Sequence, residues 1–154
     1  MRYNQVKDLV VWAADFHARM AQQFSDAAEE ANSERLKMAL TYLSSRELRM
    51  KTGLEDIFSD GSDHRDVLNT WFDDPTDFPQ PPKLEKLVES ADYNSVDVAM
   101  QTVIEAHKTL QALYEYRSDK AAIEPEEEFF TSLAQGHEAE VRLIVTSLEE
   151  FTDL

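Results

Sequence analysis

Two polar residues interrupt the apolar face of the last long helical stretch of this chain. At 100° per residue, the apolar residues of that stretch share one face: Phe130, Leu133, Val141, Ile144 and Leu148. His137 falls in the middle of the face, and Glu140, three residues later, lies at its edge. Burying an imidazole and a carboxylate is costly unless each finds a partner. The pattern therefore predicts a polar site inside a helical core.

The rest of the chain offers matching residues through an internal repeat. A shift of 90 residues aligns the two halves without a gap, so that His17 aligns with His107 and Glu47 with His137. Each half contains one helix with a histidine on or near its apolar face. Thirty residues later, each half contains a second helix with Glu or His at the centre of its apolar face. We interpret this pattern as a repeated helical hairpin.

The inward polar residues form one set of candidate metal ligands: His17, Glu47, His107, His137 and Glu140. Three imidazoles and two carboxylates are enough for one Fe, Mn or Zn ion with an open position, or for an uneven pair of ions. One ion is favoured, because a set with more imidazole than carboxylate neutralises two divalent ions poorly. The alternative is a metal-free polar layer, in which His137 pairs with Glu47, and His17 or His107 pairs with Glu140. The sequence leaves both open and assigns no catalytic residue.

Four long helices are expected to position these residues, at about 4–31, 34–58, 96–120 and 125–151. Asn32 or Ser33 is expected to cap the second helix, and Asn94 or Ser95 the third. Pro125 and the three glutamates after it are suited to the first turn of the fourth helix. The short connections make the helices of each pair antiparallel neighbours.

A long connection, the crossover, separates the two pairs of helices and contains four of the five prolines. Two short helices are expected in it, near 65–72 and 83–90. Its apolar anchors are expected to be Trp71, Phe72, Phe78, Leu84 and Leu87. His64, also in the crossover, is interpreted as a surface residue. The chain is thus expected to form one domain over 1–154: a first hairpin (1–58), the crossover (59–94) and a second hairpin (95–154).

Two helical hairpins joined by a long crossover are the connectivity of ferritin-like bundles. Over nearly its whole length the chain resembles the ferritin and rubrerythrin superfamily, most of all its rubrerythrin-type branch. In that superfamily the first helix of each hairpin carries a Glu, and the second carries Glu-x-x-His, all facing two metal ions. This chain has other residues at the same positions. His17 and His107 stand where the superfamily has the single glutamates. Glu47-x-x-Met50 stands in place of the first Glu-x-x-His motif, and His137-x-x-Glu140 in place of the second.

The resemblance implies an all-α, ferritin-like four-helix bundle that performs oxygen or peroxide chemistry or handles metal. Glu47 and Glu140 would be anionic ligands and the histidines neutral ones, while Tyr114 is either a hydrogen-bond donor to the site or a core aromatic. With no cysteine for a rubredoxin-like iron domain, electrons would come from a separate partner. The resemblance also implies a homodimer. The alternatives are a structural or interaction bundle that has lost its metals, and a bundle that binds an organic ligand beside His137.

Charge and hydropathy narrow the classes of partner. The net charge of −16 repels phosphate backbones and anionic membrane surfaces, so neither nucleic acid nor a membrane is an expected partner. No apolar run is long enough to span a bilayer, and the first residues lack the features of a signal peptide. A cytoplasmic protein is therefore expected.

Overall fold

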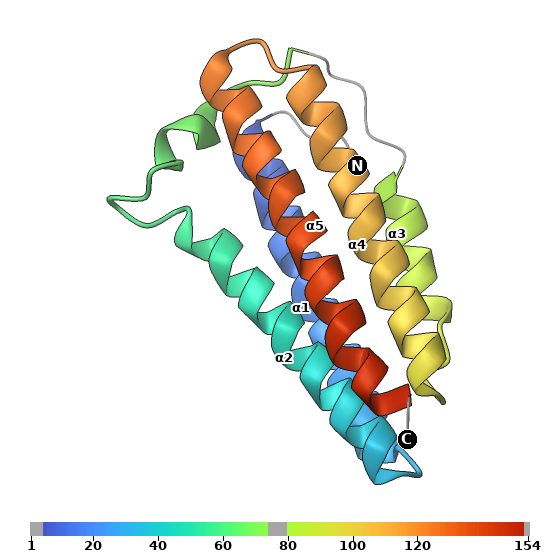
Figure 1. Ribbon diagram of the computed structural model, residues 1–154. Coiled ribbons are helices and arrows are strands. Elements are labelled where there is room, and N and C mark those ends of the chain that lie inside the picture. Colours follow the sequence, from blue (N-terminus) through green and yellow to red (C-terminus); the bar gives the residue numbers. More distant parts are fainter. Residues whose placement is uncertain (1–4, 74–79, 153–154) are drawn as a thin grey trace.

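The structure is a computed structural model that describes residues 5–73 and 80–152. Its regular elements in these residues are all helices, which confirms the all-α prediction. Four of them are long: α1 (Val6–Glu30), α2 (Glu34–Asp56), α4 (Val96–Asp119) and α5 (Glu124–Thr152). They lie side by side along a common long axis, and the described parts of the crossover, 59–73 and 80–94, lie on the outside of them (Figure 1). The expected start of the first helix at Asn4 lies outside the described residues.

The long helices pack as two pairs that share one core. Helix α1 packs along α2 and α4 along α5, while α2 also contacts both α4 and α5. The core is apolar and draws on every long helix; its largest fully buried apolar side chains are Phe16, Phe24, Tyr114, Phe129, Phe130, Leu9, Met20, Leu40, Leu43 and Leu84. None of the helices in the described part of the chain is long and apolar enough to cross a membrane.

A serine side chain caps the N-terminus of α2, and another caps that of α4. The Ser33 hydroxyl accepts a hydrogen bond from the backbone N–H of Leu36 at 3.1 Å, and the Ser95 hydroxyl accepts one from the N–H of Val98 at 3.1 Å. Each bond satisfies one of the N–H groups that a helix leaves unpaired at its start. Of the two candidates considered for each cap, the structure therefore selects serine over the preceding asparagine.

Replacing Ser33 with alanine is expected to lower the free energy of unfolding by about 1 kcal/mol, because the N–H of Leu36 loses its acceptor. Urea denaturation followed by circular dichroism measures the change. Asn32→Ala is the control, since Asn32 lies in the same turn without capping the helix, and it should change stability by less than about 0.5 kcal/mol. Equal losses in the two variants would contradict the assignment of the cap.

The crossover contains two short helices, η1 (Arg65–Asn69) and α3 (Gln80–Ser90). The first is a 3₁₀ helix that ends three residues before the expected boundary. Thr70 follows it in extended conformation, and its carbonyl accepts a hydrogen bond from the N–H of Val6 at 3.0 Å. The expected helix therefore stops where the chain is tied to the start of α1.

The apolar anchors of the crossover are only partly those expected. Leu84 is buried, and Phe72 and Leu87 pack partly buried against the core. Trp71 was expected to be an anchor, and this is wrong: its side chain is 66% exposed, and it takes part instead in an isolated backbone bridge with Gln5. Phe78 lies outside the described residues.

Candidate metal centre

Four buried polar side chains, one from each long helix, meet inside the bundle. His17 comes from α1, Glu47 from α2, His107 from α4 and His137 from α5, and none is more than 3% exposed. The 90-residue repeat relates α1 to α4 and α2 to α5. Because apolar residues on the same faces are buried in the core, these four side chains are carried inward with them. We refer to the four as the central cluster.

Glu47 joins two histidines of the central cluster. Its Oε1 lies 2.7 Å from Nε2 of His107, and its Oε2 lies 3.1 Å from the same nitrogen and 3.3 Å from Nδ1 of His17. One donor atom from each of these three residues lies within 4.8 Å of the other two. Among the described residues this is the one group of three or more His, Asp or Glu residues placed closely enough to share a metal ion.

His137 lies next to this three-residue group. Its ring centroid is 5.0 Å from that of His107 and 5.7 Å from that of His17, and the rings of His137 and His17 are nearly parallel at 20°. The Tyr114 ring lies 5.3 Å away. His137 is therefore in contact with the group, but it is not one of the three residues whose donor atoms converge.

Glu140 is held outside the central cluster by Arg46, which the sequence analysis did not identify. The Nε atom of Arg46 donates to Oε1 of Glu140 at 2.8 Å, and its Nη2 donates to Oε2 at 2.6 Å. Such a two-bond fork is a strong charge-assisted interaction. The pairing of Glu140 with His17 or His107, one form of the expected polar layer, is not what the structure shows. In the sequence, the one signal that could have drawn attention to Arg46 is its position directly before Glu47.

Burial and neighbouring charge decide the protonation of the central cluster. Burial alone would raise the pKa of Glu47, but His107 and His17 together lower it below its ordinary value, so Glu47 is ionised. Burial acts to lower the pKa of His107, yet the charge and hydrogen bond of Glu47 outweigh it and raise that pKa. Burial holds the pKa of His137 well below its ordinary value, and the charges of His107 and His17 lower it further. His137 is therefore a neutral imidazole.

Three ring nitrogens of the central cluster are buried without a hydrogen-bond partner: Nε2 of His17, Nδ1 of His107 and Nδ1 of His137. Buried polar atoms in folded proteins nearly always have a partner. Two imidazoles and one carboxylate are also a donor set that suits Zn, Mn or Fe. The residues present therefore fit one divalent ion. With Glu140 engaged by Arg46, the single remaining carboxylate fits two such ions poorly.

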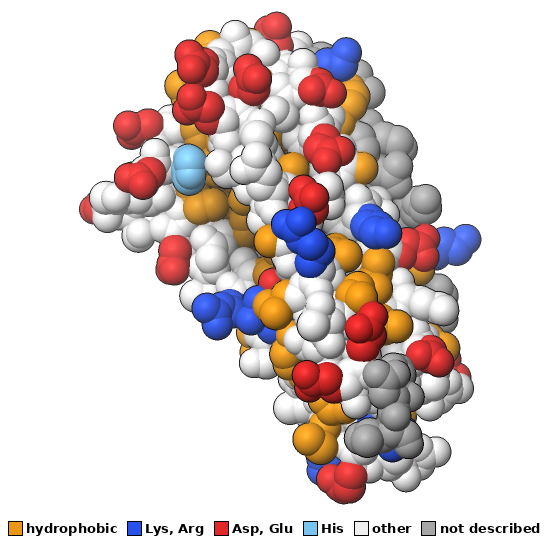
Figure 2. All heavy atoms as spheres, in the orientation of Figure 1, with side chains coloured by type: hydrophobic (Ala, Val, Ile, Leu, Met, Phe, Trp, Pro, Cys, Tyr) orange, Lys and Arg blue, Asp and Glu red, His pale blue; other side chains and the backbone are white. Residues whose placement is uncertain are grey.

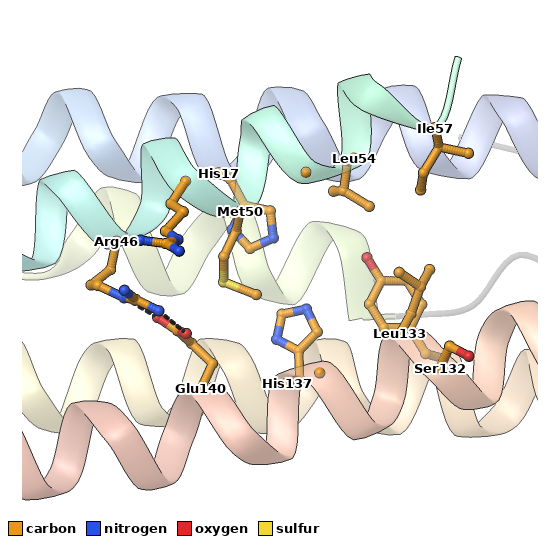
Figure 3. A pocket seen from close by; sticks show the side chains of 13 residues that line it. His17, Arg46, Met50, Leu54, Ile57, Ser132, Leu133, His137 and Glu140 are labelled. Carbon is orange, nitrogen blue, oxygen red and sulfur yellow. Dashed lines mark hydrogen bonds and ion pairs between the residues drawn. The ribbon is translucent and has the colours of Figure 1, made fainter. Parts of the chain in front are cut away.

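A pocket of about 370 Å³ between α2 and α5 leads to the central cluster. His17 and His137 form part of its lining, and Met50 lies beside both rings (Figure 3). The Arg46–Glu140 pair lies at one end of the pocket. The space-filling view shows apolar side chains in a hollow of this face, with Lys and Arg side chains near its edge (Figure 2). Two of the four central histidine and glutamate side chains therefore lie at the wall of a pocket, although both are buried.

Comparison with protein-family models, with curated proteins and with solved structures finds no match to this chain. The resemblance to the ferritin and rubrerythrin superfamily therefore stays a prediction from pattern. The functional argument accordingly depends on the geometry of the central cluster and of the pocket beside it.

Proposed function

We propose that the protein binds one divalent metal ion through His17, Glu47 and His107, and uses it for oxygen or peroxide chemistry or for metal handling. The observation that carries this proposal is the convergence of three donor atoms within 4.8 Å in a fully buried place. Buried charges in proteins are paired or coordinate metals. The chemistry of the donor set gives further support, because two imidazoles and one carboxylate suit Zn, Mn or Fe.

The arrangement of helices also supports a ferritin-like assignment. Two antiparallel pairs of long helices are separated by a long crossover, which is the connectivity of that fold. Each long helix contributes one inward polar side chain at the centre, and the metal proteins of this class likewise draw ligands from all four helices. The difference lies in chemistry: this chain presents three imidazoles and one carboxylate where that class presents mostly carboxylates.

The chain's own residues have distinct tasks in this proposal. Glu47 is ionised and provides the negative charge, while His17 and His107 would bind the ion through deprotonated nitrogens. His107 must therefore release the proton that its raised pKa favours. His137 stays neutral beside the pocket. A neutral imidazole can accept a hydrogen bond from a molecule there or donate one to it. A bound ion with an open position would supply Lewis-acid or redox chemistry toward oxygen species.

Elemental analysis by mass spectrometry tests the proposal. Protein purified without chelators and offered Fe, Mn and Zn in turn should retain about one ion per chain. Glu47→Gln and His107→Gln should each abolish retention, because each removes one converging donor. His64→Gln is the matched control: His64 contacts Phe129 with ring centroids 5.4 Å apart, outside the central cluster, and its loss should leave the metal content unchanged.

A metal-free polar layer is the second candidate, and one observation favours it. Glu47 already accepts hydrogen bonds from both His17 and His107 without an ion. Absence of bound metal under every loading condition would establish this alternative and overturn the metal proposal. Metal that persists in both Glu47→Gln and His107→Gln would place the ion elsewhere and overturn the assigned ligands.

A further inference from the structure

Two glycines lie in helix interiors on opposite walls of the pocket: Gly53 in α2 and Gly136 in α5. The chain has only three glycines, and the third, Gly61, has a positive φ of 89° that favours glycine. Each helical glycine costs about 1 kcal/mol relative to alanine. No close contact explains that cost, because a Cβ atom at either position would meet nothing within 4 Å. What the two glycines provide is open space between α2 and α5.

The inner wall of this pocket is formed by two buried histidine side chains. His137 is 3% exposed and His17 is 0% exposed, and both line the pocket. Nδ1 of His137 and Nε2 of His17 are buried and have no hydrogen-bond partner. Figure 3 shows the two rings on opposite sides of the pocket, with the Met50 side chain beside them. The inner end of the pocket is therefore lined by two buried imidazole rings.

The rest of the pocket lining is apolar at one end and contains two arginines and a glutamate at the other. Leu54, Ile57 and Leu133 gather at one end, and the Arg46–Glu140 pair lies at the other (Figure 3). The charges of Arg46 and Glu140 cancel in their two-bond pair. Arg49 also lines the pocket, is exposed, and makes no hydrogen bond or ion pair with the described residues. One unbalanced positive charge therefore faces this pocket on a chain whose net charge is −16.

We propose that the pocket between α2 and α5 binds a small organic carboxylate with an apolar body. The carboxylate meets Arg49, and the apolar body lies against Leu54, Ile57 and Leu133. A volume of about 370 Å³ lies at the lower end of the range for small-molecule sites, which are mostly apolar with a few placed polar groups. This proposal needs no bound metal ion, so it stands or falls separately from the proposed function.

Octanoate is the probe, added to the 154-residue chain in excess chelator and followed by two-dimensional amide NMR. We expect saturable shifts confined to α2 and α5 around the pocket, with a Kd of about 1 mM or tighter. Octylammonium and neutral octanol should each bind about tenfold more weakly, because they lack the carboxylate that Arg49 recognises. Shifts that do not saturate, or tighter binding of octylammonium, would overturn the proposal.

Two pairs of variants locate the site. Arg49→Gln should weaken octanoate about tenfold and leave octanol unchanged, whereas Arg142→Gln, on the exposed side of α5, should leave both unchanged. Gly136→Leu should abolish binding of both probes by filling the space, and Gly136→Ala should weaken it while raising thermal stability. Unaltered octanoate binding in Arg49→Gln or in folded Gly136→Leu would overturn the site.

A Glu47→Gln variant keeps the two proposals apart. It should lose the metal ion and still bind octanoate, because Glu47 does not line the pocket. Octanoate binding without metal in the wild-type protein would support this proposal alone, and metal without octanoate binding would support only the proposed function.

Discussion

Replacing Glu47 with alanine is expected to lower the free energy of unfolding of the metal-free protein by about 3–5 kcal/mol. The carboxylate is fully buried and is the hydrogen-bond partner of both His17 and His107. Removing it leaves two buried imidazoles without their partner, and the proton that His107 holds becomes unfavourable. Urea denaturation at pH 7 in excess chelator measures the loss.

Glu55→Ala is the matched control, because Glu55 lies on the same helix but is exposed, and among the described residues its side chain pairs only with Lys51 one turn earlier. Its loss should cost less than about 0.5 kcal/mol. Replacing His17, Glu47 and His107 together with leucine should recover most of the stability lost in Glu47→Ala, since apolar packing can substitute for a buried ion pair. If Glu47→Ala lowers the free energy of unfolding by less than about 1 kcal/mol, the hydrogen bonds of Glu47 to His17 and His107 do not hold the helices together.

Stability below pH 6.5 is expected to depend on His137. The pKa of His137 is well below its ordinary value in the folded protein, so the unfolded chain binds a proton there that the folded protein does not. The free energy of unfolding therefore falls as the pH is lowered from about 6.5 to 5, by up to about 1.4 kcal/mol per pH unit from this residue. Thermal or urea unfolding across that range measures the slope.

His137→Leu should remove this slope and raise stability most at pH 5. At pH 7.5 the gain in the free energy of unfolding should be smaller, about 1–3 kcal/mol. It arises because leucine removes the buried His137 ring, whose Nδ1 has no hydrogen-bond partner. His107 does not produce the same slope: its raised pKa gives stability that is lost as the pH rises above about 6.5. His64→Gln, outside the central cluster, is the control. An unchanged slope in His137→Leu would contradict the assignment.

The sequence predicted the helices and the four inward polar residues because helical periodicity fixes the direction of each side chain relative to its own helix. Glu47 and His137 interrupt apolar faces, His17 and His107 lie on the flanks of theirs, and all four are buried. The repeat also indicated that they lie at matching levels of the two hairpins. Their role as metal ligands stays a prediction, since periodicity gives direction and not the identity of a bound ion.

The partner of Glu140 could not be predicted in the same way. A residue at the edge of a helical face can turn toward the core or toward a neighbouring helix, and the choice depends on which long side chain the neighbour presents. Arg46 provides that side chain, reaching across from α2 with a two-bond fork. Trp71 was misplaced for a different reason: the crossover has no regular period, so hydrophobicity alone could not predict exposure.

The central cluster lies where the two hairpins meet, and this has a consequence for folding. His17 and Glu47 belong to the first hairpin, and His107 and His137 to the second. Contacts within each hairpin are close in sequence and form early, whereas docking of the hairpins must close the long crossover first. The four polar groups therefore lose their water only in the last step of assembly. An ion bound there would add a further link between the two hairpins, beside their packing, the Arg46–Glu140 pair and the Glu47–His107 hydrogen bond. It would slow their separation more than their formation.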